Sequence, residues 1–209
     1  MRPDIELNEK THQYYVAGRI LPSVSEILGV LENPYGSIPQ YILEHKAKVG
    51  KALHKILEGE WRIPIDMSEK DKRKAKALAE WVSENQPEFL GREVKTCSLE
   101  HGFAGTWDTL CRPRRGPYRG NSLRLDVKSS SKLFPDRQFP QLAAYEHCER
   151  ENGELESDIQ AILWLPPDSP AVIVESTDTF DDFKVILDVY KSQKQRHKRI
   201  EECQSQNVA

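Results

Sequence analysis

The sequence predicts an α/β protein in which helices flank a central mixed β-sheet. Two observations support this prediction. Helical periodicity dominates the first part of the chain, and three consecutive candidate strands are then followed by a helix and two more strands. This order of elements is typical of a mixed sheet flanked by helices. With 209 residues, 38% of them hydrophobic, we expect one domain over residues 1–209 with a substantial core.

The N-terminal part is expected to form a hairpin and helix extension of that domain over about residues 1–35. Residues 4–21 are typical of short strands. Ser23 and Glu26 have capping-box spacing, which predicts a short helix that begins after Ser23 and ends near Leu31.

Apolar periodicity predicts two longer helices, over residues 39–60 and 69–85, and Ser68 is placed to cap the second. The remaining expected elements are strands over 93–99, 103–111 and 123–128, a helix over 140–151, strands over 159–165 and 171–175, and a last helix over 181–203. Pro140 is expected at the first position of its helix, where its missing N–H costs nothing.

Composition excludes several classes of protein. A net charge of −3 argues against a nonspecific nucleic-acid coat protein, which is normally basic. The chain has no run of about 18 apolar residues and no apolar signal region at its start, so we expect a cytoplasmic protein without a membrane partner. Four cysteines lack the close pairs of a zinc site and are expected to be reduced, namely Cys97, Cys111, Cys148 and Cys203.

The strand expected over 123–128 alternates strictly. Leu123, Leu125 and Val127 share one face, and Arg124, Asp126 and Lys128 share the other, as in a half-buried strand. Asp126 and Lys128 then lie about 6–7 Å apart on the same face. Taken singly, each is most simply part of a solvated charge pair.

A second acid, Asp108, stands eighteen positions before Asp126. Taken singly it is most simply a turn residue at the end of a strand. Carboxylates can hold a divalent cation, and an ammonium group can stabilise a developing anion. The acids and Lys128 together suggest metal-dependent hydrolysis of phosphodiesters.

Four motifs occur in order along about residues 10–165. They are Gly50–Glu58 with its histidine His54, Gly105-Thr106-Trp107-Asp108, Asp126-Val127-Lys128, and Gln141 with Tyr145 four positions later. Together they resemble the PD-(D/E)XK nuclease superfamily, and within it the RecB-like branch that includes phage-type exonucleases. The opening segment with His12 and Tyr14 also resembles phage-encoded members of this superfamily. The resemblance implies a restriction-endonuclease-like core.

The resemblance implies a metal site. Asp108, Asp126 and the backbone carbonyl of Val127 would hold Mg²⁺, and His54 would complete the set of ligands. A histidine ligand admits Mn²⁺ as a substitute.

The resemblance also implies the remaining catalytic roles. Lys128 would orient or deprotonate the attacking water, while Gln141 and Tyr145 would brace the site and touch the DNA backbone. An accessory acid is expected before Asp108. Glu93 is the first candidate for it, and Glu100 is the rival.

A basic segment joins the two strands that carry the acids. Arginines suit contacts with DNA phosphates, although a solvated loop is an equally good interpretation of the segment alone. The arginines expected to bind DNA are Arg112, Arg114, Arg115, Arg119 and Arg124.

These expectations converge on a metal-dependent DNA nuclease, with an exonuclease of recombination, repair or phage DNA metabolism as the first candidate. The alternatives are a structure-specific endonuclease on the same fold and an inactive nucleic-acid-binding relative. DNA is the expected partner. The resemblance also implies a recombination partner protein and is compatible with a homo-oligomer.

Overall fold

The computed structural model describes residues 3–31, 39–57, 67–154 and 156–206. Residues 58–60, where the first long helix was expected to end, and residues 1–2 and 32–35 of the N-terminal extension lie outside the described part. In chain order the elements are β1 (Ile5–Asn8), β2 (Gln13–Val16), β3 (Arg19–Leu21), α1 (Val24–Ile27), the 3-10 helix η1 (Leu28–Val30), α2 (Gln40–Leu57), α3 (Glu69–Asn85), β4 (Pro87–Ser98), β5 (Phe103–Pro113), β6 (Leu123–Lys128), α4 (Pro135–Asn152), β7 (Ile159–Trp164), β8 (Val172–Glu175) and α5 (Phe180–Gln206).

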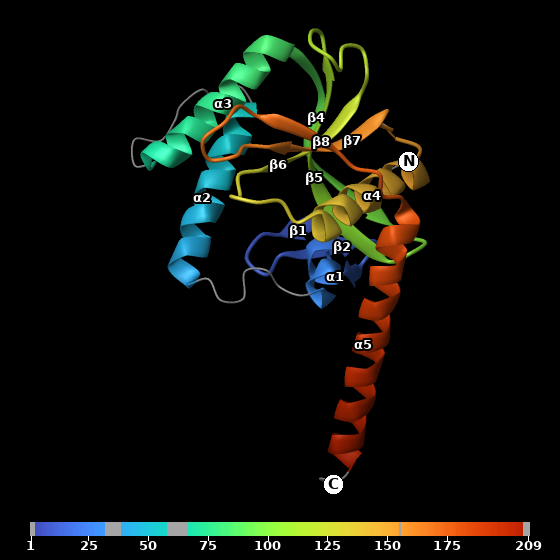
Figure 1. Cartoon of the computed structure of the whole chain (residues 1–209). Helices are drawn as coiled ribbons and strands as arrows, with labels where there is room; N and C mark the ends of the chain where they lie inside the picture. The colour runs from blue at the N-terminus through green and yellow to red at the C-terminus, as the bar shows by residue number, and fades with distance from the viewer. Residues whose placement is uncertain (1–2, 32–38, 58–66, 155, 207–209) are drawn as a thin grey trace.

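The predicted fold class is confirmed. Five strands form one mixed sheet in the order β4-β5-β6-β7-β8, in which β6 and β7 pair in parallel and the other neighbours pair antiparallel. The helix α4 connects the two parallel strands (Figure 1). A parallel connection needs such a crossover, because a tight turn can only reverse the chain direction.

Helices cover both faces of this sheet (Figure 1). On one face, apolar residues of α2 and α3, such as Leu53 and Leu78, share a core with Leu125 of β6. On the other face, α1, α4 and α5 pack around Phe103 and Trp107 of β5. The site described below lies where β5 and β6 run between these two layers.

The N-terminal strands β1–β3 form a separate antiparallel sheet. Tyr14 and Val16 of this small sheet pack against Cys97 and Ala104 of the large one. Pro22 accepts a hydrogen bond from the Ala104 N–H at 3.0 Å. The extension is therefore fastened to β5 next to the G-x-x-D motif.

Two elements begin earlier than predicted. The strand β4 starts at Pro87, because Gln86 takes a left-handed conformation that ends α3 and leads straight into the sheet. The helix α4 starts at Pro135, so Pro140 lies inside the helix and not at its first position. Pro135 already fills the position for which Pro140 was expected.

The prediction of a half-buried strand over 123–128 is wrong. Arg124 and Asp126 are buried, as are the apolar residues of the opposite face. The helix α4 covers the side that was expected to face solvent, and it brings Glu146 within 2.8 Å of the Arg124 guanidinium. The alternating pattern identified the strand. Its charged residues suggested a face open to solvent, but that face is covered, because Arg124 forms a buried ion pair with Glu146.

The last helix, α5, leaves the body of the molecule (Figure 1). Phe183 and Leu187 near its start are buried, and the Tyr190 hydroxyl donates to Glu26 at 2.5 Å. Beyond that contact the side chains over residues 191–205 are exposed. Within the described ranges, no helix has the length and apolar character needed to cross a membrane.

Candidate metal centre

The candidate site lies where β5 and β6 separate. Their antiparallel ladder runs from Cys111 paired with Leu123 to Thr109 paired with Leu125. At the next position the Asp108 carboxylate, not a backbone carbonyl, accepts the Val127 N–H at 2.9 Å. The side chain thus keeps the backbone group satisfied while the strands diverge, and the acids lie in the fork between them.

The helix α2 brings His54 to this fork. His54 follows the buried Leu53 directly and stands one turn before the buried Leu57, and the packing of these two leucines fixes the helix against the sheet. One ring nitrogen, Nδ1, bonds to Glu93, and the other, Nε2, lies 3.5 Å from Asp108 Oδ2. Ligand atoms of His54, Glu93 and Asp108 all lie within 4.8 Å of one another.

Glu93 reaches this cluster because of an unusual backbone conformation. Its φ of 47° is in the left-handed region, which residues other than glycine seldom adopt. The rival acid, Glu100, lies in the turn after β4 and is near His101 instead, with 3.8 Å between the charged atoms. Of the two candidates, the structure brings Glu93 to the site.

The charges of the cluster are strongly coupled. Burial disfavours a charged His54, but the hydrogen bond that His54 donates to Glu93 and the charges of Asp108, Glu93 and Asp126 outweigh it and raise the pKa of His54 to about 9. Burial and the nearby Asp126 raise the pKa of Asp108 to about 6, against the opposing effect of His54 and Lys128. The carboxylates therefore lie close together, and the positive charge of protonated His54 offsets part of the repulsion between them.

Asp126 and Lys128 form a close ion pair. Lys128 Nζ lies 2.6 Å from Asp126 Oδ2, with the carboxylate buried and the lysine partly open to solvent. Asp126 is near enough to His54 and Asp108 to affect the pKa values of both. The D-x-K pair therefore borders the His54 cluster.

The donor set fits a small divalent cation. Mg²⁺ prefers carboxylate oxygens and keeps several waters, and an imidazole nitrogen widens the choice to Mn²⁺. Glu93 is 45% exposed, so an ion can reach the cluster. A cation there would replace the proton held by His54 and offset the repulsion between the acids. The ligand roles expected for Asp126 and for the Val127 carbonyl stay predictions, since the cluster of ligand atoms joins His54 and Asp108 with Glu93.

Gly105 explains why the first motif begins with glycine. A Cβ atom at this position would lie 2.5 Å from the Tyr145 ring and 3.3 Å from Val24. Tyr145 is buried against the strand, and its hydroxyl accepts a hydrogen bond from the Gln141 amide at 3.2 Å. The G-x-x-D and Q-x-x-x-Y motifs are therefore in direct contact.

The predicted DNA-binding arginines divide into two groups. Arg124 is fully buried and paired with Glu146, so its assignment to DNA binding is wrong. The sequence did not reveal this ion pair, because Glu146 lies 22 positions away on α4.

The other four arginines, Arg112, Arg114, Arg115 and Arg119, are exposed. They follow the Cys111–Leu123 end of the β5–β6 ladder, whereas the acids lie beyond its Thr109–Leu125 end. At about 3.3 Å per residue, even Arg112 is about 13 Å along the strand from Asp108. Hydrogen bonds to the Asn85 carbonyl and from Tyr118 to Glu175 hold this loop against α3 and β8. The structure does not bring the loop to the cluster.

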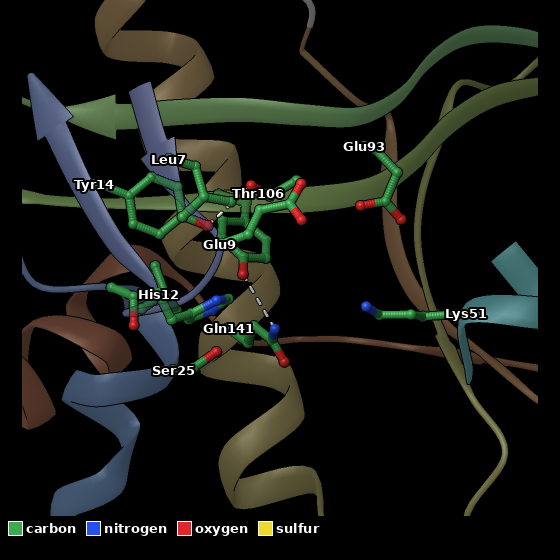
Figure 2. A pocket seen from close by; sticks show the side chains of 13 residues that line it. Leu7, Glu9, His12, Tyr14, Ser25, Lys51, Glu93, Thr106 and Gln141 are labelled. Atoms are coloured by element: carbon green, nitrogen blue, oxygen red, sulfur yellow. Dashed lines mark hydrogen bonds between the residues drawn. The ribbon is translucent and has the colours of Figure 1, made fainter. Parts of the chain in front are cut away.

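The sequence motifs did not identify a pocket beside the cluster. It has a volume of about 420 Å³ and is bounded by the N-terminal sheet, α1, α2 and α4 (Figure 2). Glu93, Gln141 and Tyr145 belong to its lining, together with His12 and Lys51. Lys51 stands three positions before His54 on one helix, and that spacing puts two side chains on the same face. This signal could have found Lys51.

Comparison with known proteins adds little. No family model matches the sequence, and no curated protein matches it. Among solved structures, the chain is similar to one titled "Crystal structure of SSO0001", at 17% sequence identity and a TM-score of 0.40. The match covers 70% of this chain and 58% of that chain, so this chain spans little more than half the length of that one. Such a similarity carries no functional argument.

Proposed function

We propose that this protein is a metal-dependent nuclease that hydrolyses phosphodiester bonds in DNA, in the manner of the PD-(D/E)XK superfamily and its RecB-like branch. One observation carries the proposal. Asp108 and the Asp126–Lys128 pair, on neighbouring strands, meet His54 from α2 and Glu93 from β4 in one fork of the sheet. Independent motifs far apart in the sequence thus converge on one point.

The chemistry of the site suits this reaction. A divalent cation, when bound, polarises a phosphate and makes a water more acidic. His54, Glu93 and Asp108 would hold it, and Asp126 adds negative charge beside them. Lys128 would stabilise the charge that builds on the phosphate as water attacks phosphorus and the bond to the leaving oxygen breaks.

The remaining residues have supporting roles in the proposal. Gln141 and Tyr145 would position the phosphate backbone from the α4 side, because their joined side chains line the pocket next to Glu93. The expected compartment, the cytoplasm of the cell that makes the protein, is part of the same proposal. A recombination partner protein and a homo-oligomer stay predictions.

Digestion of three DNA forms tests the proposal. Linear, nicked and closed-circular DNA are incubated with the protein in Mg²⁺, Mn²⁺ or EDTA. We expect loss of linear DNA in either metal, protection by EDTA, and survival of closed circles, as for an exonuclease. Loss of closed circles would instead identify an endonuclease.

The control is the same protein with Asp126→Asn, which preserves size while removing the charge. We expect its cleavage to fall by at least about tenfold, since even outer partners of metal ligands cost about 10–100-fold. If no DNA form is cut in either metal, the nuclease proposal fails and an inactive DNA-binding relative becomes the better account.

A further inference from the structure

The pocket beside the metal centre has the volume of a small-ligand site. About 420 Å³ falls within the range of about 300–1,000 Å³ for such sites. Because Glu93 belongs to both the pocket lining and the cluster with His54 and Asp108, a ligand that fills the pocket has one end at the metal centre. The proposed function therefore determines what must lie there: part of the DNA strand being cut.

The walls of the pocket suit a nucleoside with its phosphate. Leu7 and the buried Val24 and Tyr14 form its apolar part, and Ser25, Gln141 and Lys51 provide hydrogen-bonding groups. In Figure 2, the Lys51 ammonium extends from α2 toward the middle of the pocket, beneath Glu93. A base has an apolar face and a polar edge, and its phosphate attracts an ammonium group.

His12 lines the same pocket from an unusual backbone conformation. Its φ of 54° is in the left-handed region, where strain often accompanies function. Figure 2 shows the imidazole directed into the pocket, and the ring lies 6.1 Å from that of Tyr14, edge to face. The exposed His12 ring, with the buried Tyr14 ring against it, is placed for stacking on a base.

The wall that carries His12 is held firmly. Asn8 Oδ1 accepts hydrogen bonds from the N–H groups of Lys10 and Thr11 at 3.0 and 3.3 Å, which fixes the turn before His12. The Tyr14 hydroxyl lies 2.9 Å from Thr106 Oγ1 and ties this wall to β5. The pocket is therefore formed before any ligand arrives.

We propose that this pocket binds one unpaired nucleotide of the strand that is cleaved, so that the protein acts on single-stranded DNA or single-stranded ends. The inference rests on the proposed function. A duplex does not enter such a volume, since its major groove alone is about 12 Å wide. A paired nucleotide must first leave its stack at a cost of a few kcal/mol, whereas a single strand is spared most of this cost.

The test uses thymidine 5′-monophosphate as the probe, with Ca²⁺ present, followed by amide shifts in NMR. We expect saturable shifts at Leu7, Gly105 and Thr106. In His12→Gly with Lys51→Ala, binding should weaken at least about tenfold, as expected for a lost stacking contact. Glycine suits the positive φ of His12, so the turn keeps its shape. His197→Ala with Lys70→Ala, both exposed outside the pocket, is the matched control and should bind like the parent.

A second measurement compares cleavage of a single-stranded oligonucleotide with its blunt duplex, and we expect the single strand to be cut at least about tenfold faster. Absence of probe binding, equal binding by the pocket variant, or equal cutting of the duplex overturns the inference. If DNA is cut while the pocket variant behaves like the parent, the inference fails and the proposed function stands. If the probe binds in the pocket but no DNA is cut, the proposed function fails and a nucleotide site remains.

Discussion

At the scale of single residues, each side chain of the candidate site is held by a partner from another element or position. Asp108 accepts the Val127 N–H, His54 bonds to Glu93, and Asp126 contacts Lys128. Such contacts restrict the side chains before a substrate binds, which is the condition for effective catalysis by position and charge. Two substitutions test this arrangement.

Gly105→Ala should disturb the site without touching any charged residue. The new Cβ would meet the Tyr145 ring at 2.5 Å, and overpacking of a core typically costs about 1–3 kcal/mol. We expect a loss of stability in that range in urea unfolding, and DNA cleavage reduced at least about tenfold in the protein that stays folded. Gly50→Ala on α2, where a Cβ meets nothing within 4 Å, should instead gain about 0.5–1 kcal/mol. Parent-like stability of Gly105→Ala would contradict the contact.

Lys128→Ala should lose turnover and keep DNA binding, because in the proposed mechanism the lysine stabilises charge only in the reaction step. We expect single-turnover cleavage to fall by about 10²–10³-fold, as for the loss of one charge-stabilising donor. The Kd for DNA, measured by anisotropy in Ca²⁺, should change less than about threefold. Lys76→Ala, an exposed lysine paired with Glu80, is the control. Collapse of binding with normal cleavage of the bound DNA would make Lys128 a docking residue.

At the scale of elements, the position of His54 depends on how α2 packs against α3. Asp71 of α3 is the centre of that contact: His45 Nε2 lies 3.2 Å from it and Lys46 Nζ 3.5 Å, both from α2, and its neighbour Ser68 donates at 2.5 Å. Burial would raise the pKa of Asp71, but the hydrogen bonds from Ser68 and His45 and the charge of Lys46 prevail and hold it well below its ordinary value.

This lowered pKa predicts acid sensitivity. The unfolded-state pKa is about 4, and the folded-state pKa lies below it. The stabilisation by Asp71 is therefore complete above about pH 4 and is lost as the pH falls toward the folded-state pKa. We expect Asp71→Asn to cost about 1–3 kcal/mol at pH 7 and to show a shallower decline of unfolding free energy below pH 4. The exposed Asp168→Asn should follow the parent, and an identical acid profile for Asp71→Asn would refute the assignment.

The predicted role of the β5–β6 loop in DNA binding can be tested. Arg114, Arg115 and Arg119 are exposed, and a DNA backbone leaving the candidate metal centre would reach them after about four or five nucleotides at 3.4 Å each. Replacing all three with Ala should lower the magnitude of the log–log salt slope of DNA binding by about 0.7–0.9 for each lost contact. A matched triple substitution of Lys191, Arg196 and Arg199 on α5 should leave the slope unchanged. Equal slopes for the loop variant and the parent would exclude the loop.

At the scale of the whole molecule, one buried ion pair joins the sheet to its covering layer. Arg124 of β6 bonds to Glu146 of α4 at 2.8 Å, and Glu146 also accepts the Ser157 hydroxyl at 2.7 Å, just before β7. The guanidinium lies 4.7 Å from the Trp107 ring centre. These contacts hold α4, and with it Gln141 and Tyr145, over the fork.

Arg124→Ala should therefore destabilise the fold by about 3–5 kcal/mol, because removal of one partner leaves a buried charge uncompensated. Urea unfolding measures this loss. Combining Arg124→Met with Glu146→Leu should be less harmful than either single change, since no lone charge then remains. In the folded fraction, the salt slope of DNA binding should equal that of the parent. A lower slope with unchanged stability would restore the predicted DNA contact.

The sequence by itself determined the elements whose signals are local. Ser68 caps α3, which spans residues 69–85 as predicted, and alternation placed the strand over 123–128 correctly. The motif order also selected Asp108, Asp126 and His54, which the structure brings close together. Periodicity and caps depend on neighbours in the chain, so they can be read from one sequence.

The tertiary structure alone decided everything that depends on contacts between distant residues. Arg124 is buried only because α4 supplies Glu146, and Glu93, not Glu100, reaches His54 because of a left-handed turn of the backbone in β4. The pocket exists because the N-terminal sheet docks on β5 beside Gly105. Burial, a strained φ and the meeting of two sheets have no periodic signature, since each results from the packing of the whole chain.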